Sequence, residues 1–369
     1  MSDIPYGEYL VEYSAVGFKS ISKNLNLIGD FSIEIILKED IKLLDEAVVI
    51  GYGTARTKDL TGSAIVISED KFLKGSLASP EQLIMGKVPG LKVTSNDGGP
   101  GSGSTLRIRG GTSINASNDP LIVIDGVPID NGGIAGAANP LSLINPNDIE
   151  SFVVLKDASA CAIFGSRAAN GVILITTKKG QDKFSITVSQ KTSLSTIAKY
   201  ADVLSGDSLW ALIQSNGDAD QIASLGDSNY NTDWQKEIFR NSLVSDFNIA
   251  VSGKSYRFSY GNRIDNGILK RDNFIRNNIS FNLNPSLFDD HLYLESNNKL
   301  VQTNSNFSDR GALGAAYFDP TKPVFSNDTA YGGYYEWLQN DASPNTLSAR
   351  NPVGLINQKN DISKVQRYI

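Results

Sequence analysis

The strongest constraint on the fold of this chain is an alternation of apolar and polar residues that begins after Gly180. In four short stretches every second residue is apolar, and the residues between are almost all Ser, Thr, Asn, Gly or Arg. Because successive side chains of a strand point to opposite faces, this pattern predicts antiparallel strands with one apolar and one polar face. The stretches are residues 184–189, 247–252, 256–261 and 279–284, with a weaker fifth in HLYLESNNKL (291–300).

Strands of this kind occur in two physical settings. One is a half-solvated antiparallel sheet, and the other is a transmembrane β-barrel with apolar residues toward lipid and polar residues toward a wet lumen. Two long polar segments, about 191–245 and 302–362, contrast with a turn as short as Gly253-Lys254. Long loops at one end and tight turns at the other favour the barrel.

Composition excludes several classes of protein. The chain has 369 residues, so two or more structural units are expected. Its net charge of −6 argues against a generally basic nucleic-acid binder. The longest apolar runs, such as GVILI, are far shorter than the roughly 18 residues of a membrane helix. The first residues do not resemble a secretory signal, so either the native start is missing or the chain is cytosolic. Cys161 has no partner for an internal disulfide and is expected to be buried.

Changes in residue pattern along the sequence divide the chain into four parts. Residues 1–40 hold three short β patterns, which we expect to be the back half of a small β-sandwich. Residues 41–58 carry LLDEAVVIGYGTARTK, a brief β-prone run between charges, and are predicted to be a linker. Residues 59–180 are predicted to form a compact α+β unit, and residues 181–369 contain the alternating strands.

The α+β unit contains three recognisable local patterns. Ser79, Pro80 and Gln82 have the spacing of a capping box at the start of a helix of about two turns. The stretch LIVIDGVPI predicts a β-hairpin with its turn at Asp125-Gly126. The stretch DIESFVVLKDASACAIFGSRAANGVILITTKKG is typical of a strand, a short helix, a turn and a second strand.

A short strand in TLRIRGG has a cationic face. Arg107 and Arg109 lie on one side of it, and Leu106 and Ile108 on the other. In a mildly acidic chain this pair of arginines requires a partner or solvent.

The residues give no positive support for an enzyme. His291 is the single histidine and cannot by itself supply a metal site or a catalytic triad. The glycine-rich stretch NDGGPGSGS (96–104) fails both phosphate-loop patterns and is predicted to be a flexible turn. The carboxylates do not pair at a spacing that singles out an acid and a base. No catalytic residue, metal ligand or cofactor site is therefore expected.

Three segments in order carry a resemblance to a known family. LDEAVVIGYGT, LRIRGGTSINASNDPLIVIDGVPI and DIESFVVLKDASACAIFGSRAANGVILITTKKG resemble the plug region of the SusC/RagA family of TonB-dependent outer-membrane transporters. NTDWQKEIFR and the closing ARNPVGLINQ and SKVQRYI are similar to the early barrel of that family, and the first 39 residues resemble the end of its carboxypeptidase-regulatory-like domain. Cys161 and Phe164 stand where the family more usually has Thr or Ala and Tyr.

The resemblance implies an energised importer in the cell outer membrane that takes up glycans or peptides. The implied fold is an α+β plug domain at 59–180 followed by antiparallel strands of an incomplete transmembrane β-barrel. The implied partners are membrane lipid, a SusD-type surface lipoprotein and the TonB complex. The residues at the family's TonB-box position are Asp45, Glu46, Ala47, Val48, Val49 and Ile50. A β-prone segment can add as a strand to a partner's sheet, although an ordinary strand between two domains is the alternative.

The resemblance also suggests a role for the two arginines. A plug lies within a polar lumen, so Arg107 and Arg109 would face carboxylates of the barrel wall or of the plug itself. The alternative is that both are solvated surface residues.

Length is the main departure from the family. Its transporters have 22-stranded barrels, which at roughly 10 residues per strand require about 220 residues for strands alone. We therefore expect the chain to be a fragment that cannot close a barrel. A soluble β-rich binding module with a plug-like domain is the alternative, and a secreted polysaccharide hydrolase would require a carboxylate pair in a cleft.

Overall fold

The computed structural model describes most of the chain after residue 63 and short parts of the chain before it. The described residues are 7–13, 21–27, 35, 47–50, 53–56, 64–108, 110, 117–129, 141, 144–157, 161–225, 227, 229–289, 291–339, 343–345 and 347–369. Within these residues no helix has the length and apolar character required to cross a membrane.

The first folded unit is built on a five-stranded sheet. Its strands are ordered β5 (Ala64–Ser68), β10 (Ile149–Leu155), β11 (Val172–Thr177), β8 (Leu121–Ile124) and β9 (Val127–Ile129). The central strands are buried on both faces because apolar clusters cover each side of the sheet. The predicted hairpin is confirmed as β8–β9, and its turn has positive φ at both Asp125 (47°) and Gly126 (85°). Cys161 is buried beside the sheet, as predicted.

Short elements complete this unit. A two-stranded sheet joins β6 (Leu91–Ser95) to β7 (Ser104–Ile108). The predicted capping box is present, with Pro80 at the start, but the helix is a five-residue 3-10 helix, η2 (Pro80–Ile84), rather than two α-helical turns. The other 3-10 helices described here are η1 (Glu69–Lys71), η4 (Pro146–Asp148) and η5 (Ala162–Ala168). The predicted strand–helix–strand order is confirmed by β10, η5 and β11.

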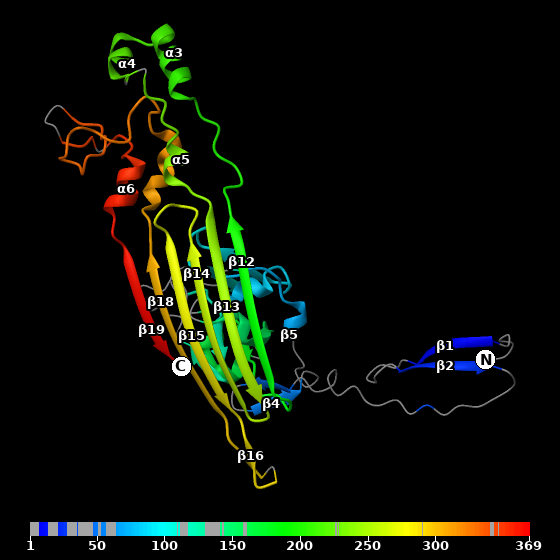
Figure 1. Cartoon of the computed structure of the whole chain (residues 1–369). Helices are drawn as coiled ribbons and strands as arrows, with labels where there is room; N and C mark the ends of the chain where they lie inside the picture. Colours follow the sequence, from blue (N-terminus) through cyan, green and yellow to red (C-terminus); the bar gives the residue numbers. More distant parts are fainter. Residues whose placement is uncertain are drawn as a thin grey trace.

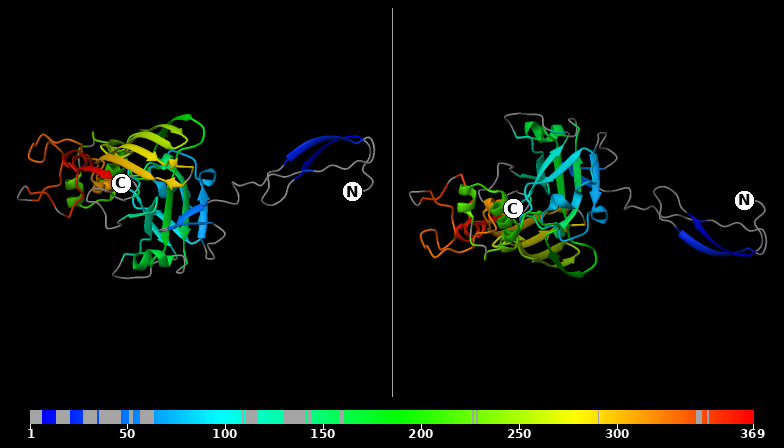
Figure 2. Two further views of the ribbon diagram at one scale, coloured as in Figure 1. Left: turned by 90° about the horizontal axis from the view of Figure 1, so that it is seen from below. Right: turned by 90° about the horizontal axis from the view of Figure 1, so that it is seen from above.

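The second unit is a six-stranded antiparallel sheet. In order it contains β12 (Ser185–Ser195), β13 (Ser242–Gly253), β14 (Tyr256–Asn266), β15 (Asn273–Leu283), β18 (Ser296–Asn306) and β19 (Ile362–Tyr368). The sheet lies along one side of the first unit and curves around it when viewed along the strands (Figures 1 and 2).

The strand predictions need three corrections. The sheet has six strands rather than five, because β19 carries almost no apolar face and escaped the alternation test. The stretch 291–300 is not one strand, since it contains β17 (Leu292–Tyr293) and then the start of β18. The polar segments are shorter than predicted, because 191–195, 242–245 and 302–306 belong to strands.

The apolar face of this sheet is exposed and its polar face is buried, which is the reverse of the pattern in soluble proteins. The apolar residues Ile186 and Val188 of β12 are 58 and 60% exposed, and Phe258 of β14 is 41% exposed. The polar residues Ser259, Asn282 and Arg257 are 0, 1 and 6% exposed. A half-solvated sheet would bury its apolar set and expose its polar set, whereas a barrel wall turns apolar residues to lipid and polar residues to the lumen. The burial therefore agrees with the barrel setting.

Loops of unequal length join the strands at the two ends of the sheet. The end at the top of Figure 1 carries α3 (Gly206–Asn216), α4 (Ala219–Ser224), α5 (Trp234–Ile238), η6 (Arg310–Tyr317) and α6 (Pro352–Gln358). The other end has the two-residue turn Lys254-Ser255 and the small hairpin β16 (Ser286–Leu287) with β17. The loops at the first end share an apolar cluster that includes Trp234, Ile238, Phe318 and Ile356.

Two hairpins precede these units along the chain. Strands β1 (Gly7–Tyr13) and β2 (Ile21–Leu27) pair antiparallel, and the third predicted β pattern, 31–39, lies outside the described residues except for Ile35. Strands β3 (Ala47–Ile50) and β4 (Gly53–Arg56) form the second hairpin.

Candidate functional site: the plug interface and the N-terminal hairpin

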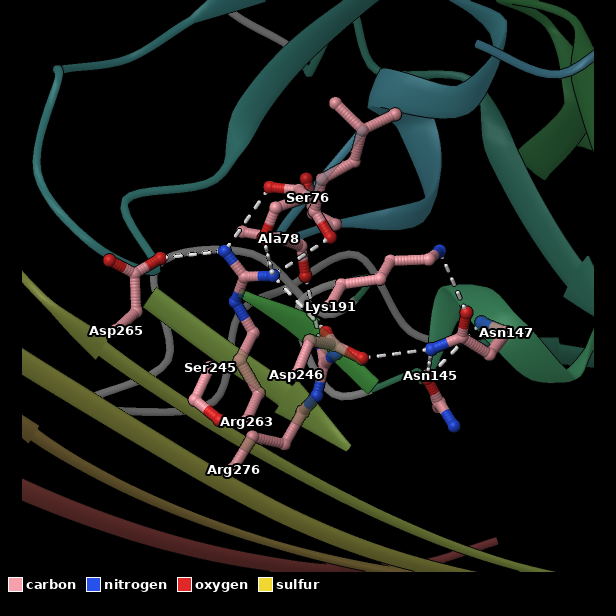
Figure 3. A network of polar contacts seen from close by, with 12 residues as sticks. Ser76, Ala78, Asn145, Asn147, Lys191, Ser245, Asp246, Arg263, Asp265 and Arg276 are labelled. Atoms are coloured by element: carbon pink, nitrogen blue, oxygen red, sulfur yellow. Dashed lines mark hydrogen bonds and ion pairs between the residues drawn. The ribbon is translucent and has the colours of Figure 1, made fainter. Parts of the chain in front are cut away.

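Two arginines of the large sheet reach into the first unit near η2 (Figure 3). Arg276 on β15 is 1% exposed, and its Nη1 donates to the carbonyl oxygens of Ala78 (2.8 Å) and Ile144 (3.2 Å). Arg263 on β14 donates from Nη2 to the carbonyl oxygen of Ser76 (3.3 Å) and from Nη1 to its hydroxyl (3.2 Å). Both guanidinium groups therefore hold the chain just before η2 by its backbone.

Carboxylates beside Arg263 balance its buried charge. Asp265 and Asp246 accept from its guanidinium at 2.7 and 3.2 Å. Asp246 also accepts from Asn147 Nδ2 of the first unit at 3.0 Å, and Lys191 Nζ donates to Asn147 Oδ1 at 3.3 Å (Figure 3). A buried cation is tolerated only with such partners, so the network fixes the register between the two units.

Other ion pairs also join the units, two of them on β14 and β18. Arg257 on β14 bonds Asp148 of η4 at 2.8 Å, and both side chains are buried. Lys299 on β18 pairs with Asp125 in the β8–β9 turn. Asp125 also accepts from the backbone N–H (2.8 Å) and the hydroxyl (2.7 Å) of Thr177, which fixes the carboxylate for the lysine.

Glu81 is a fully buried carboxyl within η2. Burial raises the pKa of Glu81 above its ordinary value of 4.5, although backbone hydrogen bonding and contacts with Ser79 and Ser104 oppose the rise. The segment that the two arginines hold thus contains a group whose ionisation depends on pH.

The strand with the cationic face is β7 in the first unit. Leu106 and Ile108 are buried in its core. Arg107 forms an ion pair with Asp119 of the same unit, and the two side chains are 32 and 42% exposed. Arg109 lies outside the described residues. The anchoring role of this pair stays a prediction.

The docking segment is described only in part. Asp45 and Glu46 lie outside the described residues, whereas Ala47, Val48, Val49 and Ile50 form β3. Strand β3 pairs with β4 alone among the described strands, so its other edge carries no strand there. Such an edge can accept one more strand from another chain.

The buried charges of the large sheet were not singled out from the sequence. Arg257 and Arg263 lie six residues apart and therefore on one face of β14, the polar face that also carries Ser259. Cations at even spacing on the polar face of an alternating strand are the signal that could have found them. Within the described residues, no group of three or more His, Cys, Asp and Glu side chains is arranged to hold a metal ion.

Comparison with known proteins gives a consistent result for this architecture. The family model for the TonB-dependent Receptor Plug Domain matches residues 56–172. The chain is 46% identical over 357 residues to the TonB-dependent receptor SusC of Bacteroides thetaiotaomicron, covering 91% of this chain and 35% of SusC. It is 32% identical to the TonB-dependent receptor P26 of Formosa agariphila, covering 88% of this chain and 33% of P26. The chain thus spans about a third of the length of these relatives.

Solved structures agree on the fold. The RagAB peptide importer in its open-open state has a TM-score of 0.67 and 24% identity, over 84% of this chain and 38% of that chain. Its closed-closed state has a TM-score of 0.64 and 23% identity, over 80% and 37%. The first unit is therefore a plug domain, and the six-stranded sheet is part of a barrel wall. Together these findings identify the chain as a member of the SusC/RagA family of TonB-dependent receptors.

Proposed function

We propose that this chain acts in the TonB-dependent import of glycans or peptides across the outer membrane, where its family resides. The observation that carries the proposal is the reversed burial of the large sheet, with apolar residues outward and polar residues against the plug. This arrangement suits a wall between lipid and a plugged polar lumen. It does not suit a soluble β-rich binding module, which would expose the polar face.

The nature of the plug contacts supports a plug that can be displaced. Ion pairs and hydrogen bonds such as Arg257–Asp148 join the plug to the wall. Polar contacts can be exchanged for contacts with water when the plug moves, whereas a dry apolar interface would have to expose its surface. A pulling force on the N-terminal side of the plug would therefore meet contacts that water can replace.

The proposed partner on that side is TonB, bound at Asp45 to Ile50. The supporting observation is the edge of β3 away from β4, which pairs with no strand among the described residues and can offer backbone donors and acceptors to an added strand. A SusD-type surface lipoprotein is the proposed partner at the loop end, because the resemblance to the SusC/RagA family implies such a protein over the barrel.

Deletion of Asp45 to Ile50 tests the docking role. In cells that grow on the imported oligosaccharide or peptide, the deletion should abolish energised uptake of the radiolabelled nutrient. Assembly in the outer membrane and nutrient binding at the cell surface should remain. Uptake at the parental rate would remove these residues from the mechanism.

Proline substitutions sharpen this test. Consecutive N–H groups of a strand point to opposite edges, so either Val48→Pro or Val49→Pro removes a donor from the free edge of β3. One of the two should block uptake, whereas Val48→Ala and Val49→Ala keep both donors and serve as matched controls. Equal uptake by all four variants would contradict docking by strand addition.

A further inference from the structure

The glycine-rich stretch predicted to be a flexible turn packs closely against the barrel wall. We call residues 96–103 the apical loop, which joins β6 to β7 at the loop end of the sheet. Gly101 has φ +68°, and a Cβ there would lie 2.5 Å from the ring of Phe274 on β15. A Cβ on Gly267 would lie 3.0 Å from Pro100. Glycine is required at Gly101 because plug and wall approach too closely there for a side chain.

Arg310 joins the apical loop to two other elements. Its Nε bonds Asp97 Oδ2 of the apical loop at 2.9 Å, and its Nη1 bonds Asp272 Oδ2 in the β14–β15 turn at 2.6 Å. The guanidinium also lies over Gly99, where a Cβ would meet Nη2 at 2.2 Å. One side chain thus holds the plug and the wall at once.

Of the two carboxylates that bond Arg310, Asp272 is the one that the wall holds in place. Its carboxylate is buried and also accepts from the backbone N–H of Ser308 at 2.7 Å, while its backbone oxygen accepts from Gly267 N at 2.9 Å. Asp97 is exposed and belongs to the plug. The contact between Arg310 and Asp97 is therefore the one that can break without disturbing the wall.

Arg310 is also the first residue of η6, whose other end borders a large cleft. Ala312, Ala315 and Phe318 of this region pack in the loop cluster with Trp234. The cleft has a volume of about 1110 Å³ and is lined in part by Tyr200, Trp234, Tyr317, Asp319 and Trp337. A shift of η6 at the cleft would move the backbone that carries Arg310.

We propose that Arg310 is a positioning residue that couples the loop cleft to the plug. It holds the apical loop in register with η6, so that a change in the position of η6 is passed to Asp97. The proposal rests on the proposed import function in one respect only, which is that the nutrient enters from the loop end that carries the cleft. Because such coupling is a free energy between two sites, a change in the plug must act on η6 as strongly as the reverse.

Spin labels can measure the coupling in native outer membranes. A label attached through Gly98→Cys reports the apical loop, because a Cβ at Gly98 has open space around it and Cys161, the one cysteine of this chain, is buried. Arg310→Gln should shift the population of the mobile spectral component by about fivefold or more. Arg310→Lys should give a smaller shift, since an ammonium cannot fork between two carboxylates in the same way.

Lys359→Gln is the matched control, since Lys359 pairs with Asp309 and Asp361 in the same loop. It should leave the spectrum unchanged. An unchanged spectrum in Arg310→Gln would overturn the proposal.

The reciprocal experiment separates coupling from a purely local role. A label attached through Gly314→Cys reports η6, where a Cβ also has open space. Asp97→Asn in the plug should mobilise this label by a similar factor. If only Arg310→Gln and not Asp97→Asn moves η6, Arg310 merely stabilises its own loop and the coupling is refuted. The spectra require no nutrient and no TonB, so loss of the import function would leave this result standing.

Discussion

At the scale of single residues, the charges between plug and wall differ greatly in their surroundings. Arg276 is buried and bonds two backbone carbonyl oxygens, so Arg276→Gln should weaken two charge-assisted hydrogen bonds and cost roughly 3 kcal/mol of plug stability. Replacing Arg107 and Arg109 together with Gln should also loosen the plug, but by less. The Arg107–Asp119 pair is partly exposed, and such pairs contribute about 0 to 1 kcal/mol.

Two measurements distinguish these residues. The melting temperature of the purified receptor should fall further in Arg276→Gln than in the double variant. Passive leak of antibiotics too large for porins should likewise rise further in Arg276→Gln than in the double variant. Unchanged melting and leak in the double variant would return Arg107 and Arg109 to the solvated-surface interpretation. Lys199→Gln is a suitable control, because the Lys199–Asp202 pair is highly exposed and lies in a loop.

Glu81 gives the plug a dependence on pH. Burial raises its pKa in the folded state above the ordinary value of 4.5. A carboxyl with a raised pKa contributes stability below its unfolded pKa, and this contribution is lost as pH rises through the folded pKa. Because the unfolded carboxyl is ionised at neutral pH, burying Glu81 costs stability there, and Glu81→Gln should raise the melting temperature at pH 7 relative to the native chain. The difference should shrink as pH falls toward 4.5, and a difference that grew on acidification would contradict the assignment.

At the scale of elements, the strands were predictable where one face is apolar and the other polar. Alternation located the ends of β12 to β15 that lie nearest the short turns, and the Asp-Gly turn located β8–β9. It missed β19, whose residues Lys364 and Gln366 share a face with Ile362, so no apolar face marks the strand. The upper ends of the strands were missed for a related reason, since polar residues occupy both faces near the loops.

The helix at Ser79 shows what local signals leave undecided. The capping box and Pro80 set where the helix begins. Its early end follows from Met85, which leaves the helical region, and from Gly86 at φ +71°. Arg263 and Arg276 of the wall donate to carbonyl oxygens just before this helix. No pattern within residues 79–86 predicts that contact.

At the scale of the whole molecule, the sequence could indicate the plug and the wall but not how they meet. The joining contacts pair residues far apart in the chain, such as Arg276 with Ala78 and Arg310 with Asp97. Each of these residues is individually unremarkable in the sequence. The loop cluster is similar, because it assembles Trp234, Leu269 and Ile356 from three separate loops. Such sites depend on which polar face closes over which plug surface, and periodicity does not specify that choice.

Because the apolar face of the wall is exposed, we can predict how the chain behaves in water without lipid. When the 369-residue chain is produced without lipid, the exposed apolar face of β12 to β18 should aggregate or be digested, as should the edges of β12 and β19 that no other described strand covers. Only residues from about 59 to 180 should survive limited proteolysis in water as a compact unit, because two apolar clusters within this unit cover its own sheet. Addition of detergent should protect residues 185–306, since micelles cover the same apolar face that lipid would. Mass spectrometry of the fragments reads both outcomes, and a resistant core of residues 181–369 in water would show that this face is covered by something other than lipid.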